Sequence, residues 1–204
     1  LCFLFIINGS NLIDGFNGLL GIHTLIILVV LLFINFFNGN NDLMYILLYV
    51  SLLILIFLKF NFPKAQMFLG DSGAYLSGAL IAVSVVKTSI LNPSVHPFFF
   101  CILLFYLFFE VFFSFFRKLF VTRQSPLFPD NKHLHMLLYK FFLKRKKSKL
   151  NLHYTVSLYI NLIYLSLIIP GIFFIKDGLF CRYYFFTLLI LYIYFYRMLY
   201  KKVK

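Results

Sequence analysis

Residues 19–37 read LLGIHTLIILVVLLFINFF and contain no charged side chain. The hydrocarbon core of a membrane is about 30 Å thick, so a helix needs roughly 20 apolar residues to cross it. Such stretches recur along the chain, and we predict full spans at 19–37, 43–60, 73–90, 97–116, 154–175 and 183–200. Residues 1–7 are interpreted as the tail of a truncated further span. The runs show no alternation of polar and apolar residues, which favours helices over barrel strands. The sequence predicts an all-α, polytopic transmembrane bundle in a single integral membrane domain, 1–204.

The composition supports this class. Of 204 residues, 62% are hydrophobic and 12% are charged, whereas a soluble domain carries about 25% charged residues. A soluble enzyme and a disordered tail are therefore excluded. The cysteines, Cys2, Cys101 and Cys181, are odd in number and far apart, and they predict neither a disulfide framework nor a zinc site.

The cations predict the orientation. Chain parity places residues 8–18, 59–72, 117–152 and 197–204 on one face, which holds 16 of the 19 Lys and Arg residues. By the positive-inside rule this face is cytoplasmic, and 117–152 is predicted to be a basic cytoplasmic loop. Its Lys and Arg run at 144–147 fits an anchor to anionic membrane lipid or a phosphate-steering surface. No nucleic acid partner is expected.

Three polar clusters fall on the predicted cytoplasmic face. In the first, Asn8, Asn11, Asp14 and Asn17 recur at every third position. This spacing places the side chains near one stripe of a helical or 3₁₀-like turn. A loop broken by glycines is the alternative, because Asp-Gly and Asn-Gly are common turn dipeptides.

The second cluster lies at 67–73, directly before a predicted span. Asp71 offers a hard oxygen ligand of the kind that Mg²⁺ accepts together with substrate phosphates. Gly70 and Gly73 are predicted to allow a close approach of the backbone. The Gly-Asp-Ser-Gly string also occurs around the nucleophile of some serine proteases, but those are β-barrels with a His and an Asp partner, which an all-helical chain excludes.

The third cluster runs from 123 to 135 and contains Arg123, Asp130, His133 and His135. Its histidines can donate to phosphate or sugar oxygens, or they can be ordinary polar loop residues. A zinc site is disfavoured, because residues two apart on a helix do not face one another.

One acid, Glu110, falls inside a predicted span, seven residues before Arg117. Ionisable groups inside spans are functional by default. The alternative is an acid satisfied by a hydroxyl such as that of Ser114, or by a neighbouring helix.

Clusters on one membrane face that combine carboxylates, amides, histidines and cations favour phosphoryl transfer at the interface. At these residues the sequence resembles the polyprenyl-phosphate N-acetylhexosamine-1-phosphate transferases, relatives of phospho-N-acetylmuramoyl-pentapeptide transferase. Residues 8–19 resemble the family's Asn-x-x-Asn-x-x-Asp-Gly block, 68–73 its Gly-Asp-x-Gly block and 125–135 its His-x-His loop. The resemblance spans roughly 1–136.

The resemblance implies transfer of N-acetylhexosamine-1-phosphate from a UDP-sugar to polyprenyl phosphate, with release of UMP. It implies Asp14 and Asp71 as catalytic residues, with Asp71 holding Mg²⁺, or Mn²⁺ as an alternative ion. The substrate-binding residues would be Asn8, Asn11, Asn17, Arg123, Asp130, His133 and His135. The implied setting is a bacterial inner membrane, as a monomer or a homodimer.

The sequence departs from the family pattern in three respects. Asn17 stands where many members have a second Asp, and Met136 where many have a third His, which favours a surface glycan such as lipopolysaccharide over peptidoglycan. The family's Asp-Asp loop has no counterpart, so we expect a C-terminal portion of a longer transferase, inactive or impaired alone. The rival hypotheses are a secondary transporter or channel and a non-catalytic membrane scaffold.

Overall fold

The computed structural model describes residues 2–121, 123, 125, 131–145 and 152–204. All regular structure within these ranges is helical. The long helices are α2 (Leu19–Phe37), α3 (Asn41–Asn61), α4 (Gly70–Leu91), α8 (Leu152–Phe173) and α9 (Gly178–Val203). The shorter elements are α1 (Cys2–Ile13), α5 (Pro97–Leu103), α6 (Phe105–Phe116), the π-helical turn η1 (Arg117–Val121) and α7 (Leu134–Arg145).

The long helices have the length and composition of membrane spans. Within the described ranges five helices qualify, and the bent pair formed by α5 and the segment Phe105–Val121 makes a sixth candidate. Their outward faces carry large apolar side chains, such as Leu53 and Ile56, which are 65% and 59% exposed. Surrounding lipid explains this exposure, which water would penalise. The chain is an integral membrane protein, and the predicted all-α bundle is confirmed.

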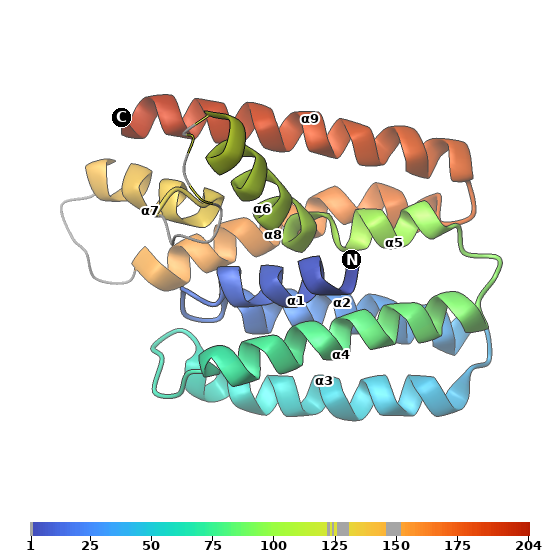
Figure 1. Ribbon diagram of the computed structural model, residues 1–204. Coiled ribbons are helices and arrows are strands. Elements are labelled where there is room, and N and C mark those ends of the chain that lie inside the picture. The colour runs from blue at the N-terminus through green and yellow to red at the C-terminus, as the bar shows by residue number, and fades with distance from the viewer. Residues whose placement is uncertain (1, 122, 124, 126–130, 146–151) are drawn as a thin grey trace.

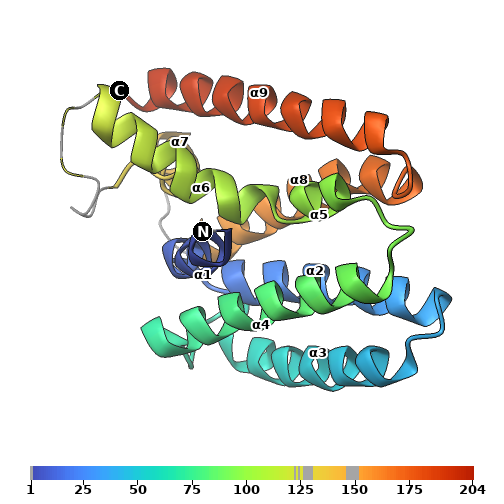
Figure 2. The same cartoon turned by 45° about the vertical axis from the view of Figure 1, so that its right-hand side comes forward.

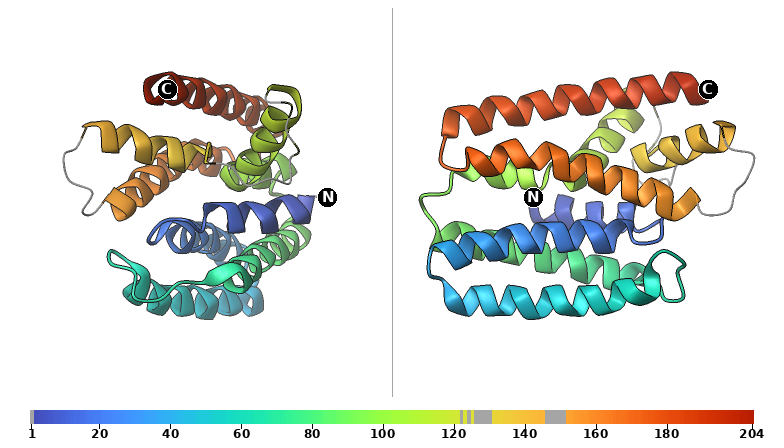
Figure 3. Two further views of the ribbon diagram at one scale, coloured as in Figure 1. Left: turned by 60° about the vertical axis from the view of Figure 1, so that its left-hand side comes forward. Right: turned by 180° about the vertical axis from the view of Figure 1, so that it is seen from behind.

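Two groups of helices enclose α1. Figure 1 shows α3 and α9 at opposite edges of the bundle, with α1 between them. The view from behind shows α2 lying between α3 and α8 (Figure 3). Helix α1 packs against both α4 and α6. It continues past the predicted end of the apolar segment at residue 7, through Asn8 and Asn11, and ends at Ile13.

The prediction of one continuous span over 97–116 is wrong. The helix breaks at Leu104, where α5 and the following helical segment meet at 73°. The break contains neither Pro nor Gly. The Tyr164 hydroxyl of α8 donates to the Leu103 carbonyl at 2.5 Å, so a side chain from another helix occupies a backbone acceptor beside the bend. A broken helix at membrane depth is tolerated where it is buried in protein, and Leu103 is fully buried.

The segment predicted as a basic loop contains η1 and α7. Helix α7 packs against α8 and α9, with Leu138 and Phe142 against the hydrophobic core. Its last turn carries Lys144 and Arg145. The prediction of a loop is therefore wrong for this part of the segment, because the many cations outweighed the apolar residues of one helix face.

The segments predicted to share a membrane face lie at one end of the bundle. Figure 1 shows the turn after α1, the loop between α3 and α4, α7 and the C-terminus at this end. The α2–α3, α4–α5 and α8–α9 connections lie at the opposite end. We call the first the cation-rich end, because its segments hold 16 of the 19 Lys and Arg residues.

Labelling tests this arrangement directly. In a background where Cys2, Cys101 and Cys181 are serine, Lys64→Cys and Asn41→Cys place one exposed thiol at each end of α3. We expect a membrane-impermeant maleimide to label Lys64→Cys from one side of sealed vesicles and Asn41→Cys from the other side. Labelling of both from the same side would contradict α3 as a membrane span.

Candidate functional site

Helix α1 is held close to two neighbours by glycines. A Cβ at Gly9 would collide with the backbone carbonyl of Leu107 in α6. A Cβ at Gly78 of α4 would lie 2.7 Å from the Ile7 Cα. Small residues at helix interfaces let backbones approach in this way. These contacts position the polar end of α1 against the start of α4.

The polar residues that recur at every third position lie in two kinds of structure, a helix and the turn after it. Asn8 and Asn11 lie in α1, whereas Asp14 and Asn17 lie in the turn that follows. The Asn8 side chain donates to the Leu4 carbonyl of its own helix at 2.7 Å. The Asn11 side chain donates to the Tyr75 hydroxyl of α4 at 3.2 Å. Both predicted forms, the helix and the glycine-containing turn, are therefore present in succession.

The turn after α1 is fastened to the loop between α3 and α4. The Asn17 amide donates to the Pro63 carbonyl at 3.0 Å. The Gly18 N–H donates to Asn61 Oδ1 at 2.7 Å, and Asn61 Nδ2 donates to the Met67 carbonyl at 2.6 Å. Gly18 has a φ of 75°, a conformation that favours glycine. An aspartate at position 17 could not donate to Pro63, so this amide has a structural task.

The carboxylates of Asp14 and Asp71 influence one another. Asp71 lies exposed in the first turn of α4. Partial burial, and secondly the negative charge of Asp71, raise the pKa of Asp14 from 3.8 to about 6. At neutral pH Asp14 is still mainly ionised, so its negative charge lies in the turn that faces α4. The preceding Gly70 has a φ of 63°, and a Cβ added there would have nothing within 4 Å. Glycine is therefore favoured at position 70 by its backbone conformation and not by the predicted close approach of another backbone.

This pair fits a divalent cation that a substrate helps to bind. Within the described ranges no group of three or more His, Cys, Asp or Glu side chains is placed to hold a metal ion. Mg²⁺, however, is commonly bound by one or two carboxylates, with substrate phosphates and water completing its shell. Two coupled carboxylates, one of them exposed, match that donor set.

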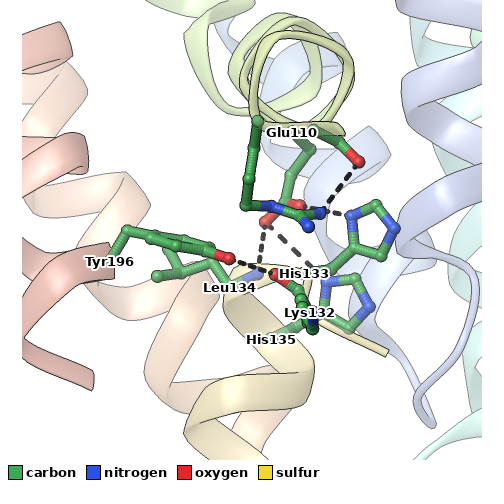
Figure 4. Close-up of polar contacts among 8 residues, drawn as sticks. Glu110, Lys132, His133, Leu134, His135 and Tyr196 are labelled. Atoms are coloured by element: carbon green, nitrogen blue, oxygen red, sulfur yellow. Dashed lines mark hydrogen bonds and ion pairs between the residues drawn. The ribbon is translucent and has the colours of Figure 1, made fainter. Parts of the chain in front are cut away.

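The histidines of the third cluster gather around Glu110. Figure 4 shows the Glu110 carboxylate pointing from α6 toward His133, His135 and the beginning of α7. His133 Nδ1 lies 3.0 Å from Glu110 Oε2, and the Leu134 N–H donates to Oε1 at 3.2 Å. His135 Nδ1 lies 3.9 Å from Oε1. All three titratable side chains are buried, so Glu110 fixes the start of α7 from inside the bundle.

One sequence interpretation fails at this cluster, and one alternative is resolved. The rings of His133 and His135 stack at 5.6 Å with an angle of 8°, although residues two apart were expected to diverge. The helical rule does not apply, because His133 precedes the first residue of α7. Of the two partners considered for Glu110, the neighbouring helix is the one observed, because the first residue of α7 donates to the carboxylate. The Ser114 hydroxyl instead accepts from Arg117 at 3.3 Å.

The His cluster meets the turn that carries Asp14. The Cβ position of Gly15 lies 4.0 Å from His135 Nε2. The Phe16 ring lies 5.4 Å from that of His135 and 4.9 Å from that of His153. Neither ring nitrogen of His135 has a hydrogen-bond partner in the described part of the chain. The turn therefore joins the coupled carboxylates on one side to a buried histidine on the other.

The remaining predicted residues are less defined. Arg123 is exposed, with a φ of 49°. Asp130 lies outside the described residues. The sequence analysis missed Asn61, Tyr75 and Phe16, which hold or cover the site. Asn61 did carry a signal, since it ends an apolar run two residues before Pro63, and Tyr75 lies four residues after Asp71 on the same helical face.

Comparison with known proteins identifies this arrangement of motifs. Residues 1–89 match the family model described as glycosyl transferase family 4. Over these residues the chain is similar to glycosyl transferase family 4. The matched residues of this chain include both carboxylates, Asp14 and Asp71, and the helices that position them.

Relatives of two kinds are similar to this chain. Undecaprenyl-phosphate alpha-N-acetylglucosaminyl 1-phosphate transferase of Thermotoga maritima is 32% identical over 133 residues, 65% of this chain and 39% of that protein. Phospho-N-acetylmuramoyl-pentapeptide-transferase of Dictyoglomus turgidum is 36% identical over 126 residues, covering 61% and 41%. A probable undecaprenyl-phosphate N-acetylglucosaminyl 1-phosphate transferase of Bacillus subtilis is 30% identical over 149 residues, covering 71% and 40%. The chain spans about two fifths of the length of these relatives. No solved structure matches it significantly.

Proposed function

We propose that the protein transfers N-acetylhexosamine-1-phosphate from a UDP-sugar to a polyprenyl phosphate such as undecaprenyl phosphate. An oxygen of the acceptor phosphate forms a bond to the sugar-bearing phosphorus of the donor. The bond from that phosphorus to the bridging oxygen breaks, and UMP leaves. The product is a lipid-linked diphosphate sugar, which would begin a cell-surface glycan.

The coupled pair of Asp14 and Asp71 carries the proposal. It lies at the cation-rich end, where the turn after α1 meets both the start of α4 and the buried His135. Phosphoryl transfer needs little covalent help from a protein, because positioning and charge stabilisation provide most of the catalysis. A site of carboxylates, amides and histidines beside the membrane fits that need.

The residues can be given roles in this reaction. Asp71 and Asp14 would hold Mg²⁺, which when bound neutralises charge on the diphosphate and on the departing nucleotide. Asn11, fixed by Tyr75, would orient the nucleotide sugar. His135 Nδ1 faces Glu110, whereas its buried Nε2 has no hydrogen-bond partner among the described residues, so a phosphate or sugar oxygen would satisfy Nε2. Asn17 would act indirectly, by holding the loop before α4.

The proposed orientation places the cation-rich end in the cytoplasm of a bacterial cell, at the inner membrane. Lys and Arg concentrate in cytoplasmic segments of membrane proteins, and UDP-sugars are water-soluble donors that would reach this end. The amide at position 17 favours a surface glycan other than peptidoglycan. The named relatives include enzymes of both kinds, so the choice between these two glycan classes rests on this residue and on Met136.

Incorporation of a labelled sugar tests the proposal. Membranes containing the full-length protein that carries this sequence are incubated with radiolabelled UDP-N-acetylhexosamine and undecaprenyl phosphate. We expect label in the organic phase, UMP in the aqueous phase, loss of both with EDTA, and recovery with Mg²⁺ or Mn²⁺. Matched membranes without the protein are the control. Absence of lipid-linked label with every N-acetylhexosamine tried would contradict the proposed reaction.

A further inference from the structure

A cavity opens at the cation-rich end, between α6 and η1 on one side and α9 on the other. Its volume is about 420 Å³. Figure 2 shows the last turns of α6 approaching the C-terminal end of α9. Neither Asp14 nor Asp71 lines this cavity, so it is separate from the candidate transfer site.

The cavity is lined by four cations, Arg117, Lys132, Arg197 and Lys201. None of its described lining residues is acidic. Arg117 is 7% exposed and donates to Ser114 Oγ at 3.3 Å, so its guanidinium is held in place before any ligand arrives. It lies in η1, and π-helical turns often occur at functional sites. This lining is suited to a phosphate group.

Aromatic rings form the walls. Phe113, Phe116 and Phe120 contribute from α6 and η1, and Tyr196 and Tyr200 contribute from α9. Phe116 and Phe120 are 42% and 67% exposed on the outside of the bundle, where lipid surrounds the spans. Aromatic residues are common at the level of lipid head groups. The cavity thus joins a cationic interior to an apolar, lipid-facing wall.

One wall of the cavity is tied to the candidate transfer site. The Tyr196 hydroxyl of α9 donates to the Lys132 carbonyl at 2.9 Å, as Figure 4 shows. Lys132 directly precedes His133, which contacts Glu110. A ligand in the cavity would therefore contact the segment that precedes His133. Asp14 and Asp71 do not line the cavity.

We propose that this cavity binds the head group of an anionic phospholipid, with an acyl chain along Phe116 and Phe120. The phosphate lies among the four cations, and the chain extends into the bilayer. A phospholipid fits better than the proposed polyprenyl phosphate acceptor, because the acceptor phosphate must reach Asp14 and Asp71. The choice of a phospholipid over the acceptor rests on the proposed function, whereas the binding of an anionic lipid in the cavity can be measured without the transfer reaction.

Fluorescence quenching tests this site, because the chain contains no Trp. Phe120→Trp places a single reporter at the exposed wall. The chain is reconstituted in phosphatidylcholine vesicles that contain either brominated phosphatidylglycerol or brominated phosphatidylcholine. We expect half-maximal quenching at a roughly tenfold lower mole fraction of the anionic lipid, which corresponds to about 1.4 kcal/mol of binding free energy, because the cations of the cavity attract a net negative head group.

Two pairs of substitutions separate a built site from general surface charge. In the Phe120→Trp background, Arg197→Gln with Lys201→Gln removes two lining cations. Lys59→Gln with Lys64→Gln removes two exposed cations at the same end that do not line the cavity. We expect the first pair to abolish the anionic preference and the second pair to retain it.

Three outcomes would overturn the proposal. The first is equal quenching by the two brominated lipids in the Phe120→Trp chain. The second is an equal loss of preference in both substituted pairs, which would indicate bulk attraction to the membrane surface. The third is relief of quenching by polyprenyl phosphate at far lower mole fractions than by unlabelled phosphatidylglycerol, which would make the acceptor the occupant.

Discussion

Asp71→Asn is expected to lower the rate of sugar-phosphate transfer by roughly 10³-fold or more. The substitution keeps the size of the side chain but removes one of the two carboxylates that would hold the divalent cation. A metal ion provides several kcal/mol of charge stabilisation in a phosphoryl transfer, and each 1.36 kcal/mol corresponds to a factor of ten in rate. The measurement is release of UMP from the UDP-sugar by membranes that contain the variant.

Asp42→Asn is the matched control for this prediction. Asp42 is also exposed and also lies in the first turn of a span, α3, but at the opposite end of the bundle. We expect it to retain the parent rate. Unchanged turnover in Asp71→Asn, with equal protein in the membrane, would remove Asp71 from the proposed metal site.

Glu110→Ala is expected to lower the free energy of unfolding by about 2–5 kcal/mol, because it leaves buried donors without an acceptor. The carboxylate accepts from the Leu134 N–H and from His133 Nδ1. Since His133 is 4% exposed, water would not easily replace this acceptor. Loss of the contact also frees the start of α7, so transfer activity should fall with stability.

Thermal unfolding with a thiol-reactive dye measures the loss of stability in Glu110→Ala. Cys181 is fully buried, whereas Cys2 and Cys101 are exposed, so replacing the exposed pair with serine leaves one thiol that reacts only on unfolding. Glu110→Gln is the control, because its amide oxygen still accepts one hydrogen bond, and a smaller loss is expected. An unfolding temperature of Glu110→Ala equal to that of the parent would show that α7 is held by other contacts.

Much of the bundle could be predicted from the sequence. The charge-free run at 19–37 coincides with α2, and the predicted spans at 43–60, 73–90, 154–175 and 183–200 each lie largely within one long helix. Span length follows from membrane thickness, and the need to satisfy backbone groups in lipid requires helices. The placement of the polar clusters at one end could also be predicted from the sequence. The alternation of connecting segments between the two membrane faces, and the positions of the cations, depend on the order of residues alone.

The internal geometry could not be predicted in the same way. The break at Leu104 has no Pro or Gly signal, and it depends on a hydroxyl from Tyr164, 60 residues later in the chain. The pairing of Glu110 with His133 likewise required the start of α7 to lie against α6. Neither partner could be identified from spacing, since the contacts join segments whose relative placement is set by packing.

The chain order and residue types by themselves determined a helical membrane protein and its cation-rich end, and they predicted a site at Asp14 and Asp71. These properties depend on local periodicity and charge, which act over a few residues. Only the tertiary structure decided that Asn17 holds a loop, that Glu110 fixes the histidines, and that a cationic cavity lies against α9. Those outcomes depend on which helix faces meet, and side-chain packing decides this only when the bundle is assembled.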